Sequence, residues 1–351
     1  MTAAGGGMAA VIIAGALFAS INVYVLMGGA DLGAGVWDLL ASGPRREPQR
    51  SLIAAAIGPI WEADHIWLIL AVVLCFTAFP GAFAVLATVL HIPLALALIG
   101  IVLRGSAFVF RSYGGPAARQ RWGRTFAIAS LLTPLLLGVA TGAISTDAVG
   151  VANAAIGTGS FAQIFVAPWL APFPIAIGLL AVALVGQLAA TYLTVAAPDA
   201  GLADDFRRRA LAATGAVAVL AAVATVLARR EYSFAWGLRL AGPRSWLWIA
   251  ITVAAGVAGT VFLLRRRYRA ARIAVGAEAS LILWGWAASE FPYLIPPHVT
   301  IQGAAAPRTT LITLLWALGL GLVILIPSLR YLLRHFTAGT IPPSPEAGDR
   351  P

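Results

Sequence analysis

Nine separate runs of about 20 apolar residues divide the sequence, and each is long enough to cross about 30 Å of hydrocarbon as a helix. Of all residues, 60% are hydrophobic and only 11% are charged, which excludes an ordinary water-soluble domain. We therefore predict an all-α integral membrane protein with about nine transmembrane helices. The runs cover residues 8–27, 52–79, 81–103, 126–146, 171–196, 210–228, 246–264, 273–289 and 311–333.

The basic residues predict the orientation of these helices. All 24 are arginine, and they lie mainly in short segments between apolar runs. With the N-terminus outside and the C-terminus in the cytoplasm, most arginines fall in inner segments, as positive residues in membrane proteins do. This pattern favours membrane orientation over binding of nucleic acid. The outer segments would hold Arg229, Arg230, Arg239, Arg244 and Arg308.

The chain reads as one polytopic membrane domain over residues 1–336. No arginine precedes the first run, so we expect a permanent span there and not a cleaved signal peptide. Prolines in residues 337–351 predict a disordered tail. Cys75 is the only cysteine, and we expect no metal site.

Ionisable residues within the apolar runs are the first candidates for function, because burying them in hydrocarbon is costly. Asp31 follows the first run, and Arg104 closes the third. The second run contains Glu62, Asp64 and His65. Together these five residues predict a polar line from the inner surface toward the middle of the membrane.

Helical spacing sorts the charges of the second run. Glu62 and His65 are three residues apart and share a helix face, whereas Asp64 faces away. Glu62 and His65 therefore predict a buried acid–base pair, and the whole group predicts a proton entry path. The alternative is that these charges only tie helices together.

Three sequence blocks resemble subunit II of the cytochrome bd quinol oxidases. Residues 28–35, GGADLGAG, are similar to the family signature Asp-Gly-Phe-Asp-Leu-Gly-Val-Gly. Residues 59–69, PIWEADHIWLI, resemble its Pro-x-Trp-Asp/Glu-x-Asn-x-x-Trp-Leu segment. Residues 104–111, RGSAFVFR, resemble Arg-Gly-x-Ala-Phe-Glu-Phe-Arg. The likeness extends over nearly the whole chain.

The resemblance implies two four-helix bundles, at about residues 1–150 and 165–290, plus one peripheral helix at 310–336. It implies a heterodimer in the bacterial plasma membrane with subunit I, which holds haem b and haem d and the quinol site. This chain would bind no haem directly and would not be active alone. By this resemblance, the complex would oxidise quinol and reduce dioxygen to water with protons drawn from the inside.

The resemblance also assigns roles to single residues. Asp31 and Glu62 match carboxylates of the family's proton path, and Trp67 matches a tryptophan associated with dioxygen access. The shared structural motif includes Trp61, Gly33, Gly35 and Arg111.

Four positions depart from the family pattern. Gly28 replaces an aspartate, Asp64 replaces an asparagine, His65 stands where Glu or Gln is usual, and Val109 replaces an acid. The proton route is therefore either rerouted through Asp64 and His65 or impaired.

Two rival functions fit the same charges. A proton-coupled secondary transporter would use them to bind a coupling ion, although we find no internal repeat of the kind that transporters often show. A purely structural membrane partner is the other alternative. The sequence leaves open whether ubiquinol or menaquinol is the donor, whether this chain holds a structural quinone, and whether a small extra subunit exists.

Overall fold

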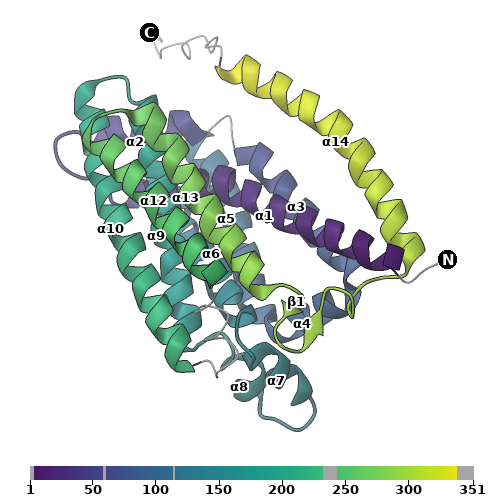
Figure 1. The fold of residues 1–351 in the computed structure, drawn as a ribbon. Helices are drawn as coiled ribbons and strands as arrows, with labels where there is room; N and C mark the ends of the chain where they lie inside the picture. Colours follow the sequence, from purple (N-terminus) through teal and green to yellow (C-terminus); the bar gives the residue numbers. More distant parts are fainter. Residues whose placement is uncertain (1–3, 58–60, 114, 232–242, 338–351) are drawn as a thin grey trace.

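The protein is almost entirely helical (Figure 1). The computed structural model describes residues 4–57, 61–113, 115–231 and 243–337. The first part of the chain forms α1 (Ala4–Leu39), α2 (Arg46–Ile57), α3 (Trp61–Ala78), α4 (Pro80–Val89), α5 (His91–Tyr113) and α6 (Pro116–Ile144). The remainder forms α7 (Ala148–Ala154), α8 (Phe161–Phe165), α9 (Pro172–Ala196), α10 (Ala200–Glu231), α12 (Pro243–Leu264), α13 (Tyr268–Glu290) and α14 (Arg308–Thr337). Strands β1 (Tyr293–Ile295) and β2 (Val299–Thr300) pair as a short antiparallel hairpin.

The structure confirms a multi-pass membrane protein. Within the described residues, seven helices are long and apolar enough to cross a membrane: α1, α5, α6, α9, α10, α12 and α14. The other two predicted spans correspond to α3 and α13. Helix α13 is less apolar because it carries Arg272, Glu278 and Glu290.

The second and third predicted runs are divided differently from our expectation. Residues 52–57 form the end of α2 and residues 61–78 form α3, whereas residues 81–103 fall in α4 and α5. Helices α3 and α4 meet at a bend of 116°. Pro80 starts α4, and a proline, which lacks an N–H, is well placed at the start of a helix and poorly placed inside one. The apolar run therefore turns at Phe79, whose side chain is fully buried.

Helix α9 lies at the centre of the molecule, where it packs against α1, α6, α10 and α13. Its contact with α1 is close, because a Cβ atom at Gly33 would overlap the Val185 carbonyl oxygen. Gly35 permits a similarly close contact between α1 and α6, because a Cβ atom there would overlap the Ser130 side chain. The glycines of the predicted motif thus set the distance from α1 to two neighbouring helices.

Helix α14 lies at the edge of the molecule, beside α1 and α3 (Figure 1). Most of its surface is exposed, including Trp316, which is 77% exposed. Its first turns join a core at the hairpin end of the molecule, where Ile13, Phe79, Ile295 and Leu311 are buried together.

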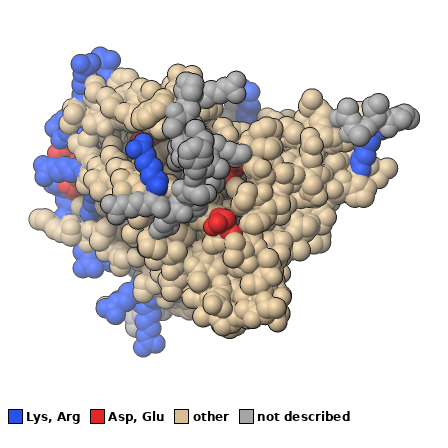
Figure 2. Space-filling view, turned by 60° about the horizontal axis from the view of Figure 1, so that its bottom comes forward, with Lys and Arg blue, Asp and Glu red and all other residues tan. Residues whose placement is uncertain are grey.

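Large apolar side chains also cover the outer faces of α3 and α5. Ile69, Phe76, Leu98 and Val102 are exposed there. Figure 2 shows a face of the molecule that is mostly uncharged, with arginines gathered toward its margins. Apolar surface on this scale needs lipid or another protein to cover it.

Candidate functional site

A buried ion pair joins α1 to α5. Arg104 Nη2 lies 2.5 Å from Asp31 Oδ1, and the two side chains are 3% and 1% exposed. Arg104 also donates through Nη2 to the Asp31 carbonyl oxygen at 3.3 Å and through Nε to Ser130 Oγ at 3.1 Å. The structure therefore brings together Asp31 and Arg104 as the polar line requires. Gly35 contributes indirectly, because its missing side chain leaves room for Ser130.

A second ion pair repeats this arrangement two helical turns further along both helices. Arg111 donates through Nη1 and Nη2 to Asp38 Oδ2 and Oδ1, at 2.9 and 3.2 Å. Asp31 and Asp38 are seven residues apart, as are Arg104 and Arg111, so each ion pair joins matching faces of α1 and α5 at successive levels. The buried Phe126 ring lies 4.9 Å from the Arg104 guanidinium carbon and 5.7 Å from that of Arg111. These distances permit cation–π attraction from both cations.

The charges of α3 are arranged differently from our prediction. We expected Asp64 to face away from His65, but Asp64 Oδ1 lies 2.5 Å from His65 Nδ1. Adjacent side chains on a helix can still meet when their rotamers direct them toward each other. Residue spacing alone does not give these rotamers. The side chain of Glu62, the predicted partner, lies outside the described residues, as does that of Trp61. The Glu62–His65 pair stays a prediction.

The Asp64–His65 pair lies close to the Asp31–Arg104 pair. Asp31 interacts electrostatically with both Asp64 and His65. The Tyr24 ring of α1 meets the His65 ring edge-on, with centroids 6.5 Å apart. Two acids, two bases and a phenol from three helices thus form one polar cluster inside the apolar part of the molecule.

The sequence did not single out Tyr24, Phe126 or Ser130 as members of this site. A phenylalanine or a serine in an apolar helix has no distinctive pattern, and only the packing of α6 against α1 and α5 gives these residues their role. Trp67 is half-buried on α3, one turn from Asp64. No group of three His, Cys, Asp or Glu side chains in the described ranges converges as a metal site would require.

A separate polar cluster lies in the second half of the chain. The buried Gln187 amide of α9 donates to Glu278 Oε2 of α13 at 2.8 Å and to Thr214 Oγ1 of α10 at 3.0 Å. The cluster therefore links three helices. Glu278 lies within the predicted apolar run 273–289.

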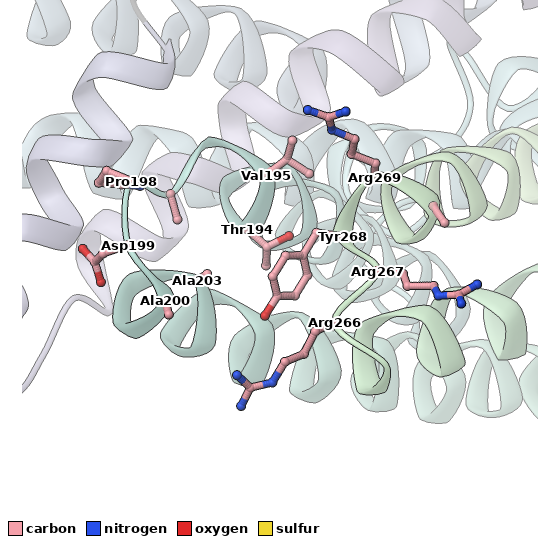
Figure 3. A pocket seen from close by; sticks show the side chains of 12 residues that line it. Thr194, Val195, Pro198, Asp199, Ala200, Ala203, Arg266, Arg267, Tyr268 and Arg269 are labelled. Atoms are coloured by element: carbon pink, nitrogen blue, oxygen red, sulfur yellow. The ribbon is translucent and has the colours of Figure 1, made fainter.

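A shallow hollow of 670 Å³ lies between the α9–α10 and α12–α13 connections (Figure 3). Thr194 and Tyr268 line it, and Arg266, Arg267 and Arg269 surround it (Figure 3). It contains none of the predicted site residues. Its position at the ends of four helices fits the basic rim expected where helices leave the membrane.

A surface ion pair ties the loop before α2 to α10. Arg45 donates through Nη2 and Nε to Asp205 Oδ1 and Oδ2, at 2.5 and 2.7 Å. These hydrogen bonds raise the pKa of the exposed Arg45 guanidinium above its ordinary value. Gln49 of α2 donates to the same carboxylate at 3.0 Å, so α2 is held against the second half of the chain.

Comparison with known proteins identifies the family. The model of the cytochrome bd terminal oxidase subunit II family matches residues 9–336. A putative cytochrome bd menaquinol oxidase subunit II of Bacillus subtilis (strain 168) is 24% identical over 337 residues, which cover 93% of this chain and 95% of the relative. The cytochrome bd-I ubiquinol oxidase subunit 2 of Escherichia coli (strain K12) is 26% identical over 174 residues, or 48% of this chain and 44% of that protein.

A solved structure shares the fold. The bd oxidase from Geobacillus thermodenitrificans aligns with a TM-score of 0.77 and 22% sequence identity, over 94% of this chain and 98% of that chain. The relatives are subunits of quinol oxidases, which are oxidoreductases. Because the family model covers nearly all of its length, this chain belongs to the cytochrome bd terminal oxidase subunit II family.

Proposed function

We propose that this chain is the non-haem membrane subunit of a bd-type quinol:dioxygen oxidoreductase. It would scaffold a haem-bearing partner, subunit I, and supply that partner with protons and a route for dioxygen. Haem b, haem d and the quinol site would lie in the partner, so the chain alone would have no oxidase activity. The observation that best supports this proposal is the cluster of buried charges between α1, α3 and α5.

Reduction of dioxygen to water consumes protons, and the buried cluster offers a way to deliver them. Asp31, Glu62, Asp64, His65 and Arg104 would form the path. Titratable groups inside a membrane protein, placed within electrostatic reach of one another, are the usual basis of a proton relay. The arrangement of Asp31 beside both Asp64 and His65 supports this role.

Dioxygen is apolar and concentrates in the hydrocarbon of the membrane. Trp67 lies half-buried on α3, whose outer face is otherwise apolar and exposed. We assign Trp67 to dioxygen access at this face. The exposed apolar faces of α3 and α5 would be covered in part by subunit I and in part by lipid.

In the membrane we propose nine crossings, made by the seven apolar helices together with α3 and α13. The first bundle would contain α1, α3, α5 and α6, the second α9, α10, α12 and α13, and α14 would be the peripheral helix. The packing of α5 on α6, of α1 on α3 and of α12 on α13 supports this grouping. The arginine distribution supports an outer N-terminus in a bacterial plasma membrane.

Isolation from the native membrane tests this function. The detergent-solubilised protein should copurify with a haem-bearing subunit, show b- and d-type bands in a reduced-minus-oxidised spectrum, and consume dioxygen when quinol is added. Comparing ubiquinol with menaquinol in the same assay would identify the donor. A colourless protein that moves a solute across vesicles would establish a carrier instead, and a colourless protein with no transport activity would indicate a purely structural partner.

A further inference from the structure

The Asp64 carboxylate occupies a space that exists because residue 28 has no side chain. A Cβ atom built on Gly28 would lie 2.9 Å from Asp64 Oδ2 and 3.0 Å from the Tyr24 ring. Gly28 belongs to α1 and Asp64 to α3, so the carboxylate of one helix fills a gap in the other. An acid at residue 64 and a side chain at residue 28 therefore compete for one location.

His65 connects this buried carboxylate to the surface of the chain. The Asp64 side chain is 2% exposed, whereas the His65 side chain, whose Nδ1 contacts it, is 30% exposed. Histidine exchanges a proton near neutral pH more readily than any other side chain. The pair thus joins a buried acceptor to a ring that water, or a partner subunit, can reach.

The neighbouring Asp31–Arg104 pair has a different chemistry. A guanidinium does not give up its proton in a protein, so Arg104 is a permanent cation. It is also held by the Asp31 carbonyl oxygen and by Ser130 Oγ, and it lies over the Phe126 ring. Asp31 is therefore fixed as the counter-ion of Arg104.

We infer that the Asp64–His65 pair is the proton-exchanging unit of this cluster and that Asp31–Arg104 is a fixed charge pair that positions it. A proton from water would bind the second ring nitrogen of His65 as the Nδ1 proton passes to the Asp64 carboxylate. One proton enters, one moves inward, and no electron is transferred. Among the side chains that the structure describes, Tyr24 of α1 meets the His65 ring edge-on, and Asp31 of α1 interacts electrostatically with both members of the pair. This inference rests on the proposed proton path.

Moving the carboxylate across the helix contact tests the inference in the intact complex. Asp64→Asn should lower quinol-driven oxygen uptake per haem at least tenfold. Asp64→Ala should lower the rate in the same way, and its short side chain vacates the gap beside Gly28. Gly28→Asp combined with Asp64→Ala returns a carboxylate to that space from α1, and should recover most of the lost rate. Gly28→Asn combined with Asp64→Ala is the matched control, because it fills the gap without an acid and should recover nothing.

A second readout separates proton exchange from a structural role of His65. His65→Gln should slow oxygen uptake, and imidazole added to the assay should restore part of the rate because the ring position is partly exposed. Gly15→Ala is the control for the substitutions at Gly28, because it adds a Cβ atom to the same helix, α1, where nothing lies within 4 Å.

Two results would overturn the inference. Full oxygen uptake in Asp64→Asn, together with slow uptake in Glu62→Gln, would leave the proposed path in place but exclude Asp64 from it. With normal haem content, no recovered rate in the Gly28→Asp, Asp64→Ala variant, or equal recovery in its Gly28→Asn control, would show that Asp64 acts through packing. Full uptake in the Asp64, Glu62 and Asp31 variants alike would instead remove the proton path itself.

Discussion

Asp31 on α1 and Arg104 on α5 form an ion pair from which water is almost wholly excluded, with 2.5 Å between Oδ1 and Nη2. Taking two charges out of water is costly, and their attraction offsets that cost only when each finds its partner and further hydrogen bonds. Arg104 has these bonds in Ser130 and in the Asp31 backbone. The pair therefore links α1 to α5, and the Asp64–His65 pair of α3 lies near it.

Removing one member of this pair should destabilise the subunit strongly. Asp31→Asn leaves the buried Arg104 cation without its counter-ion, and we expect a loss of roughly 3–5 kcal/mol in the free energy of unfolding. Thermal unfolding of the purified complex measures the change. Asp147→Asn, at an exposed position, is the control and should have little effect.

Replacing both members should cost much less. Asp31→Leu with Arg104→Met fills similar volume with apolar side chains and leaves no charge unpaired, a change that is often neutral in other proteins. We expect the double variant to unfold at a higher temperature than Asp31→Asn. Equal losses in the two variants would show that the ion pair is not the source of the stability.

The close approach of α1 to α9 should not tolerate a methyl group. Gly33→Ala would push a Cβ atom into the Val185 carbonyl oxygen, and overpacking of this kind costs roughly 1–3 kcal/mol or more. Gly15→Ala on the same helix meets open space and should leave stability unchanged or slightly higher. Parallel melting curves of the two variants provide the comparison, and similar midpoints would contradict the packing described for Gly33.

The polar cluster of the second half should depend on the Gln187 amide. Gln187→Leu removes the donor to the Glu278 carboxylate, and leaving a buried acceptor unsatisfied costs roughly 1–3 kcal/mol. Adding Glu278→Leu removes the acceptor as well and should restore much of the free energy of unfolding that Gln187→Leu loses. Chemical denaturation of the three proteins measures these differences. A double variant less stable than Gln187→Leu alone would argue against a direct role for the hydrogen bond.

Trp67 should influence how dioxygen reaches the partner. Trp67→Ala removes a large, half-buried ring from α3, and we expect a changed apparent KM for dioxygen with normal haem content. Trp316→Ala on α14 removes an equally large ring that is 77% exposed and serves as the control. Oxygen-electrode traces at falling dioxygen concentration give both values. Identical KM values for the two variants and the parent would remove Trp67 from the route.

The helices of this protein could be predicted well because hydrocarbon length and apolar composition leave few alternatives. Seven of the nine apolar runs could be placed on single helices without knowing their packing, but the division of the second and third runs, with the bend at Phe79 and Pro80, could not. A proline in an apolar run marks either a kink or a new helix, and the angle depends on what packs around it.

The charged residues of the site could be found from the sequence, but their partners could not. Asp31 and Arg104 were predicted to share one polar line, and the structure joins them directly. Asp64 was expected to face away from His65, but the two side chains are in contact. Residue spacing in a helix gives the direction of each Cβ atom and does not give the rotamer of the side chain beyond it. The gap at Gly28 that admits Asp64 depends on the contact between α1 and α3, which no local pattern encodes.

The most direct test of the proton path is the rate of quinol-driven oxygen uptake per haem in complexes carrying Glu62→Gln or Asp31→Asn, with Asp147→Asn as control. A path through these residues predicts at least a tenfold lower rate in both variants, about 1.4 kcal/mol in the barrier, with an unchanged haem spectrum. Parental rates in both variants would contradict the account.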